Sequence, residues 1–182
     1  ANEVYVYGSF LQSAMYHAGV TCSDCHNPHS LERRAEGNAL CGQCHQASTF
    51  DTEKHHGHPM GSEGAECVSC HMPADTFMGV DERQAHSFRI PRPDLSVALG
   101  VPNVCTDCHQ DKSAQWAADA LEQRHGEPPQ DHFAGALHAG RYGGPQAELQ
   151  LARLIQDTTQ PAIARATAAS LLPRYLSQQT VP

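Results

Sequence analysis

The feature that most constrains this chain is the arrangement of its eight cysteines. They fall in four C-x-x-C pairs, and a histidine follows the second cysteine of every pair. The cysteines are Cys22, Cys25, Cys41, Cys44, Cys67, Cys70, Cys105 and Cys108, and the histidines are His26, His45, His71 and His109. C-x-x-C-H is the attachment signature of c-type haem, because two thiols on one short turn can reach both vinyl groups of a porphyrin while the histidine reaches its iron. The sequence therefore predicts four covalently bound haem c groups.

Other uses of paired cysteines explain less of the pattern. A zinc ribbon uses C-x-x-C twice, and the interval from Cys25 to Cys41 has a suitable length, but zinc needs no histidine after every second cysteine. A disulfide scaffold would scatter its cysteines, and thioredoxin-like motifs lie in βαβ units that are not evident here. Haem attachment accounts for the histidines as well as the cysteines.

The composition indicates that a bound group forms part of the core. Up to about residue 110 the chain is rich in Gly, Pro, Cys, His and charged residues, and only 6% of all residues are aromatic. Side chains of this kind make a thin core that a metal, disulfides or an organic cofactor must fill. The net charge of −8 argues against nucleic acid and anionic lipid as partners. No apolar stretch is long enough to span a bilayer.

Nine further histidines supply candidates for the second axial position of each iron. A second imidazole gives six-coordinate iron suited to electron transfer, whereas an open position would allow substrate chemistry. The candidate distal ligands are His17, His29, His55, His58 and His86, and we expect at least one ligand from the cluster of His55, His56 and His58. We expect the remaining His125, His132 and His138 to be exposed, and Met15, Met60, Met72 and Met78 to pack against haem faces rather than to bind iron.

His29 is the most informative of the candidates. It follows His26 by three residues, which span at most about 10 Å, too little to pass round the edge of the porphyrin that His26 binds. If His29 is a ligand, it must therefore serve a different haem, which would bring two porphyrins into close contact. The alternative is a solvated loop histidine.

The rest of the chain reads as short elements followed by longer helices. Residues 4–7 could form a short strand or extended arm, and Ser9 could cap a helix from about Phe10 to His17. We expect each motif histidine to lie on a short helix, and Pro91 and Pro93 to interrupt helical structure. After the last motif we expect a helix from Ser113 to about Arg124, and further helices at about 130–140, 146–157 and 161–177.

With these motifs in view, the first 125 residues resemble the multihaem cytochromes related to hydroxylamine oxidoreductase, its tetrahaem electron acceptor and pentahaem nitrite reductase. The stretch C-S-D-C-H-N-P-H (22–29) is similar to that superfamily's motif with a trailing histidine, which ligates the neighbouring haem of a stacked pair. Tetrahaem domains that precede TPR or HEAT-like repeats share G-N-A-L-C-G-Q-C-H (37–45), G-A-E-C-V-S-C-H-M-P (64–73), H-S-F-R-I-P-R-P-D-L-S (86–96) and C-T-D-C-H-Q-D-K-S-A-Q-W-A (105–117). The resemblance implies electron transfer in the periplasm or at the cell surface.

The expected fold is mainly α-helical with a high loop content. Residues 1–125 would form a multihaem cytochrome c domain organised around stacked haems, and residues 126–182 a HEAT-like helical hairpin. We expect an exported periplasmic or extracellular protein whose signal peptide has been removed. Its partners would be redox proteins, including copies of itself in a filament.

The alternative function is a haem reductase of a small nitrogen or sulfur oxyanion, with one open axial site. The nitrite reductases of the superfamily that this chain resembles use a C-x-x-C-K motif, and no such motif occurs in this sequence. We therefore expect electron transfer rather than enzyme activity.

Overall fold

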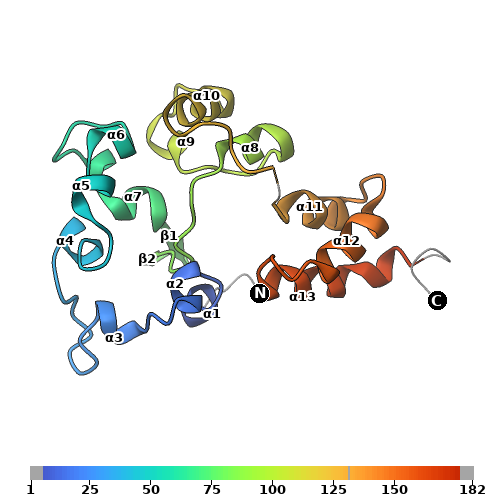
Figure 1. Cartoon of the computed structure of the whole chain (residues 1–182), viewed down its shortest axis with the longest axis horizontal. Coiled ribbons are helices and arrows are strands. Elements are labelled where there is room, and N and C mark those ends of the chain that lie inside the picture. The colour runs from blue at the N-terminus through green and yellow to red at the C-terminus, as the bar shows by residue number, and fades with distance from the viewer. Residues whose placement is uncertain (1–5, 131, 177–182) are drawn as a thin grey trace. The chain divides into compact units, whose positions relative to one another are not determined.

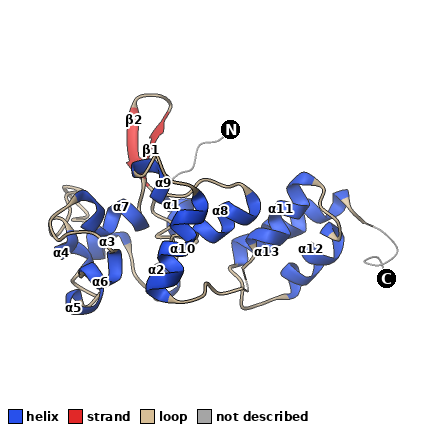
Figure 2. Ribbon diagram, turned by 90° about the horizontal axis from the view of Figure 1, so that it is seen from above, coloured by secondary structure: helices blue, strands red, loops and turns tan. Residues whose placement is uncertain are grey.

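The computed structural model of the chain describes residues 6–130 and 132–176. It divides into two compact units: the first contains residues up to 93 together with 102–126, and the second contains 94–101 together with 127–182. The described residues are mainly helical, with one two-stranded sheet (Figure 1; Figure 2). The predicted mainly α-helical fold with many loops is therefore confirmed. No helix in this part of the chain has the length and apolar character that a membrane span requires.

Apart from α10, the first unit consists of short helices joined by loops, most of which lie in the blue-to-green part of Figure 1. Its helices are α1 (Val6–Phe10), α2 (Ala14–His17), α3 (Cys22–Cys25), α4 (Asn38–Cys41), α5 (Ala47–Phe50), α6 (Glu53–His56), η1 (Glu63–Ala65), α7 (Cys67–His71), α9 (Cys105–Cys108) and α10 (Ala114–His125). Strands β1 (Ala74–Phe77) and β2 (Asp81–Gln84) pair antiparallel, with Ala74 opposite Gln84. Helices of four or five residues are not stable alone, so tertiary contacts or a bound group must hold them.

Few apolar side chains of the first unit are buried. Within its described residues, only Phe10, Ala65 and Ala117 form a buried hydrophobic set. This agrees with the thin core that the composition predicts. The unit therefore gains little stability from side-chain burial compared with a domain of similar length.

The second unit contains α8 (Pro93–Leu99), which begins at the unit boundary, and a group of longer helices, α11 (Ala134–Tyr142), α12 (Ala147–Gln156) and α13 (Ala162–Leu171), followed by the 3-10 turn η2 (Leu172–Arg174). Leu151, Leu154, Ala168 and Leu171 form its buried core. On α13 the buried residues Ala164, Ala168 and Leu171 recur at helical spacing, so one face of the helix is apolar. The Tyr175 hydroxyl donates to the Gly140 carbonyl at 2.8 Å and ties the residue after η2 to α11.

The secondary structure predicted for residues 4–17 is wrong. The helix expected from Phe10 to His17 is two helices, because the hydroxyl of Ser13 accepts from the Tyr16 amide at 3.1 Å and begins a new helix there. Ser9 lies inside α1 and is not the cap. Of the strand expected at residues 4–7, Val6 and the next residue are helical, and residues 4–5 lie outside the described residues.

The later helices agree better with the prediction. Ser113 caps α10 as expected, by accepting from the Trp116 amide at 3.1 Å. Helix α12 lies within the predicted range, whereas α11 begins about four residues later than predicted. Helix α13 ends at Leu171 instead of 177, since Pro173 has no amide hydrogen to continue the ladder. Two elements were not predicted: the β1–β2 hairpin, and α8, for which Pro93 provides the first residue rather than an interruption.

Candidate haem-binding sites

Three of the four C-x-x-C-H motifs have both cysteines on one helical turn. Of the motif histidines only His71 lies within its helix, so the prediction that every motif histidine lies on a short helix is wrong for the other three. Helices α3, α7 and α9 contain both cysteines of their motifs, and in the remaining motif Cys41 ends α4 and Cys44 lies in the turn that follows. Residues three apart on a helix share one face, so both thiols of a pair can point the same way. The amides of His26, His45 and His109 donate at 2.9 Å to the carbonyl of the first cysteine of their motif. The local fold therefore presents two thiols and an imidazole together, as the attachment chemistry requires.

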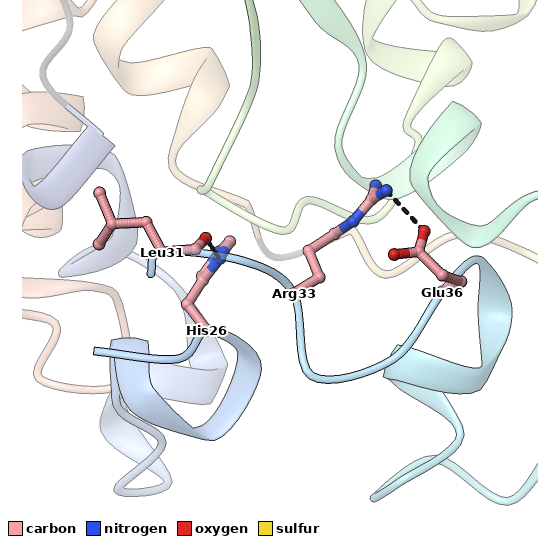
Figure 3. Close-up of polar contacts among 4 residues, drawn as sticks. All are labelled: His26, Leu31, Arg33 and Glu36. Atoms are coloured by element: carbon pink, nitrogen blue, oxygen red, sulfur yellow. Dashed lines mark hydrogen bonds and ion pairs between the residues drawn. The ribbon is translucent and has the colours of Figure 1, made fainter. Parts of the chain in front are cut away.

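Backbone carbonyls hold two of the motif histidines through Nδ1. The Nδ1 of His26 donates to the Leu31 carbonyl at 3.0 Å (Figure 3), and that of His71 donates to the Arg89 carbonyl at 2.9 Å. With the proton fixed on Nδ1, the lone pair of the neutral ring lies on Nε2. An imidazole held in this way by its outer nitrogen is the usual arrangement of a metal-binding histidine. In both rings Nε2 is therefore the nitrogen with a lone pair that a metal could bind.

The loop after α3 is shaped to supply one of these carbonyls. Leu31 has a left-handed backbone, with φ 61°, and its amide donates to the Asn27 carbonyl at 2.8 Å. The Asn27 side chain accepts from the His29 amide at 2.9 Å. Figure 3 also shows the Arg33–Glu36 ion pair of 2.7 Å, which is exposed and adds little stability. The tight loop thus turns the Leu31 carbonyl back towards the His26 ring.

Three motif histidines face a second histidine at a similar distance. The ring centroids of His26 and His86 are 6.4 Å apart, those of His71 and His55 6.3 Å, and those of His109 and His58 5.9 Å. The ring planes of these pairs are inclined by only 25°, 17° and 27°. Two metal–nitrogen bonds of about 2.0 Å and two ring radii of about 1.2 Å would put the centroids about 6.4 Å apart. The three pairs therefore have the separation of two axial ligands on one iron.

The outer nitrogens of two distal candidates are also bound to carbonyls. The Nδ1 of His86 donates to the Gln84 carbonyl at 2.8 Å, and that of His58 donates to the His56 carbonyl at 2.7 Å. The pKa of His55 is lowered by burial and, to a lesser extent, by His125, His71 and His56. A lowered pKa keeps this imidazole neutral, which is the form that binds metal. His55, His58 and His86 thus each have a feature expected of a metal ligand.

His56 does not fit the ligand role. Its ring lies 6.3 Å from that of His58, but two residues cannot extend round a porphyrin, so these two cannot share an iron. Its Nδ1 accepts from the His58 amide at 3.2 Å, which leaves the proton on Nε2. This Nε2 is covered by protein atoms and has no hydrogen-bond partner among the described residues. Of the three clustered histidines, His55 and His58 are the ones whose rings face motif histidines.

The remaining site histidines are not brought into such pairs. The His45 ring packs edge-on against Phe50 at 5.7 Å, and the His17 ring lies against Tyr16 at 5.6 Å. His29 is exposed. Among the described residues, neither His17 nor His29 makes a ring contact with a motif histidine. The distal partner of His45 stays a prediction.

The thiols show which motifs are neighbours in space. Burial raises the pKa of Cys25, with a further contribution from Cys41, and burial together with the hydrogen-bonded Cys41 thiol raises the pKa of Cys67 to about 12. Burial also raises the pKa values of Cys70 and Cys105, each of which lies near a thiol of the other's motif. The first motif is therefore next to the second, the second next to the third and the third next to the fourth.

Asn38 connects the second and third motifs. Its side-chain amide donates to the Asp51 carboxylate and to the Ala65 carbonyl, both at 2.9 Å. Its side-chain oxygen accepts from the Cys67 amide at 2.8 Å. One side chain at the start of α4 thus fixes the start of α7. No sequence pattern identified this residue, because its partners lie far along the chain.

The paired imidazoles suit a metal that brings its own equatorial ligands. Two axial nitrogens per site are enough for a haem iron, since the porphyrin supplies the other four. Among the described residues there is no group of three or more His, Cys, Asp or Glu side chains placed to hold a bare metal ion. The residues present therefore fit covalently attached haem.

Comparison with known proteins supports the interpretation of the cysteine pattern as haem attachment. Residues 15–50 match a protein-family model described as the doubled CXXCH motif. This is a motif of multihaem c-type cytochromes. It covers the first two motifs, up to and beyond His45, and supports electron transfer through covalently bound haem.

The crystal structure of the outer cell wall cytochrome OcwA aligns with 95% of this chain at 18% sequence identity and a TM-score of 0.38. The chain spans 45% of the length of that structure. No curated protein sequence matches the chain.

Proposed function

We propose that the chain transfers electrons through four haem c groups, one attached at each C-x-x-C-H motif. The observation that supports this most strongly is the set of three opposed histidine pairs at 5.9–6.4 Å. When bound, each haem iron supplies a one-electron couple whose potential depends on its axial ligands and burial. At the three motifs with opposed histidines, paired imidazoles would fill both axial positions and exclude substrate, so the proposed activity of these haems is electron transfer and not catalysis.

In the proposed arrangement each motif histidine is a proximal ligand. His86 is the distal ligand opposite His26, His55 the one opposite His71, and His58 the one opposite His109. For the haem at His45, we propose His29 or His17 as the distal ligand. His29 remains the better candidate of the two, because its short tether to His26 prevents it from binding its own haem.

The order of the motifs in space defines a path. The thiol neighbours Cys25–Cys41, Cys41–Cys67 and Cys70–Cys105 place the motifs in the same order in space as in the sequence. The haem at His26 and the haem at His109 would then be the two ends of the path. Electrons would enter and leave at these ends.

A second candidate function rests on His45. Its ring contacts Phe50 instead of a histidine, so a haem at this motif could keep an open axial site and act as a reductase of a small nitrogen or sulfur oxyanion. Electron paramagnetic resonance separates the two functions, because an open ferric haem is high-spin.

The test of the main proposal is a haem count combined with the spin state. We expect the intact mass and the reduced pyridine haemochrome spectrum of the purified protein to give four haems per chain. We expect the oxidised protein to show low-spin ferric signals for at least the three haems with opposed histidines. Fewer than four haems, or a spectrum dominated by high-spin iron, would contradict the proposal.

Gly64 provides a local test of the ligand at His58. A Cβ on Gly64 would lie 2.4 Å from the His58 ring, whereas a Cβ on Gly8 would meet nothing within 4 Å. We expect Gly64→Ala to displace the imidazole and to convert part of one haem to the high-spin form. Gly8→Ala is the matched control and should leave the spectrum unchanged. An unaltered low-spin spectrum in Gly64→Ala would argue against His58 as a ligand.

We also propose the finer assignments that the sequence suggested. The first unit would be related to the hydroxylamine oxidoreductase superfamily, and α12 with α13 would form a HEAT-like hairpin. The chain would be exported to the periplasm or the cell surface and exchange electrons with redox proteins, including copies of itself in a filament. Negative-stain images of the purified protein test the filament, because a uniform monomer contradicts it.

A further inference from the structure

The distal candidates His55 and His58 lie on one short segment, residues 52–64. His55 lies in the last turn of α6 and faces His71, while His58 follows the helix and faces His109. Because His71 and His109 belong to different motifs, one segment reaches two haem sites. A displacement of this segment would therefore disturb two axial ligands together.

Hydrogen bonds between its own residues hold this segment in a loop. The Thr52 hydroxyl accepts from the His55 amide at 3.3 Å, and Gly57 ends α6 in the left-handed conformation, with φ 79°. The Glu53 carboxylate accepts from the Met60 amide at 3.2 Å. These bonds make residues 52–60 a compact loop.

The carboxyl end of α10 holds this loop from outside. The His125 Nε2 donates to the His55 carbonyl at 3.1 Å, and the Arg124 guanidinium donates to the Glu53 carbonyl at 3.3 Å. The rings of His55 and His125 are 5.5 Å apart. A Cβ on Gly57 would come within 2.6 Å of the Arg124 side chain, which shows how closely the two elements approach.

We propose that Arg124 and His125 are positioning residues that set the distal ligands of two haems, those at His71 and His109. The inference rests on the proposed function, in which His55 and His58 are ligands. It makes these two haems a linked pair: the same two hydrogen bonds restrain both sixth ligands. The haem at His26, whose proposed distal ligand is His86, does not depend on these two hydrogen bonds.

Carbon monoxide binding to the reduced holoprotein tests the link, because the distal imidazole must leave the iron before the gas can bind. Each lost hydrogen bond weakens the restraint modestly. We expect the double variant Arg124→Ala/His125→Ala to accelerate binding about tenfold at two of the four haems. Arg124→Lys with His125→Gln keeps both donors and should restore most of the slow rate.

Gln123→Ala on the same helix is the matched control and should bind carbon monoxide at the original rate. Acceleration at one haem, at all haems or at none would overturn the inference. Pyridine haemochrome content and the low-spin signals of the unaltered protein are measured first. If these measurements show no six-coordinate haem in the unaltered protein, the proposed function fails. If the unaltered protein has six-coordinate haem but the double variant binds carbon monoxide at the original rate, only this inference is contradicted.

Discussion

Replacing His86 with alanine is expected to convert one of the four haems from low-spin to high-spin. The His86 ring lies 6.4 Å from that of His26, and the Gln84 carbonyl holds its Nδ1. Alanine removes the imidazole and leaves the iron at His26 with one axial ligand. We expect carbon monoxide to bind the reduced form of this haem at least about 100-fold faster, given that even changes to residues supporting a ligand cost 10- to 100-fold in metal affinity.

Two further measurements make the His86 result specific. Added imidazole should refill the site and restore the low-spin signal, and His86→Met should keep six-coordinate iron with a raised potential, since a thioether favours the ferrous state. His138→Ala is the control, because that ring packs against Tyr142 in the second unit. If His86→Ala shows the same low-spin signals as the unaltered protein, the pairing of His26 with His86 is wrong.

Replacing Leu151 with alanine is expected to destabilise the second unit by about 2–5 kcal/mol. Leu151 is 0% exposed at the centre of the core formed with Leu154, Ala168 and Leu171. It fills the space above Gly140, where an added Cβ would come within 2.9 Å of it, and a glycine offers no side chain to occupy the cavity left behind. The loss should appear as a lower transition temperature of the helices of this unit.

The Leu151 experiment uses two probes. Far-ultraviolet circular dichroism follows the helices, and the haem Soret band follows the first unit, so the two transitions are distinguished without assuming a single unfolding step. We expect the Soret band in native conditions to stay unchanged. Leu149→Ala, at a site 41% exposed on the same helix, should change stability by about 0.5 kcal/mol or less. Equal effects at the two positions would contradict the core assignment.

The parts of the fold that were predicted correctly depend on local sequence. The helical turns α3, α7 and α9 each span both cysteines of one motif, and Ser113 caps α10 through a residue three positions away. The apolar stripes of α12 and α13 repeat at helical spacing, so their existence follows from periodicity alone. For these elements, neighbouring residues contain all the information that the prediction requires.

Other elements were missed because their signals are weak or ambiguous. Strand β2 contains Asp, Glu, Arg and Gln, which lack the apolar alternation of a strand, and its hairpin turns at Met78 with an unusual φ of 54°. Ser9 and Ser13 are equally good caps as residue types, and the sequence does not show that Ser13 is the one used. A proline such as Pro93 can either end or begin a helix, so its role depends on the residues after it.

The candidate site was only half predictable for a different reason. The sequence proposed five distal histidines, and the structure places three of them opposite motif histidines. Which histidine faces which motif depends on contacts between distant residues, such as His26 and His86, and no local pattern encodes these. The same holds for Asn38, and for His125, which was expected to be merely exposed and is exposed, yet donates to the His55 carbonyl.

The order of the three histidine pairs along the chain has a consequence for biogenesis. The His55–His71 pair lies wholly within the interval between His26 and His86, and the His58–His109 pair overlaps both. With the export and the pairing proposed above, both ligands of the haem at His71 would emerge before the second ligand of the haem at His26. The haem at His26, the first motif in the sequence, would then have a single axial ligand until His86 emerges, after both ligands of the haem at His71 are present.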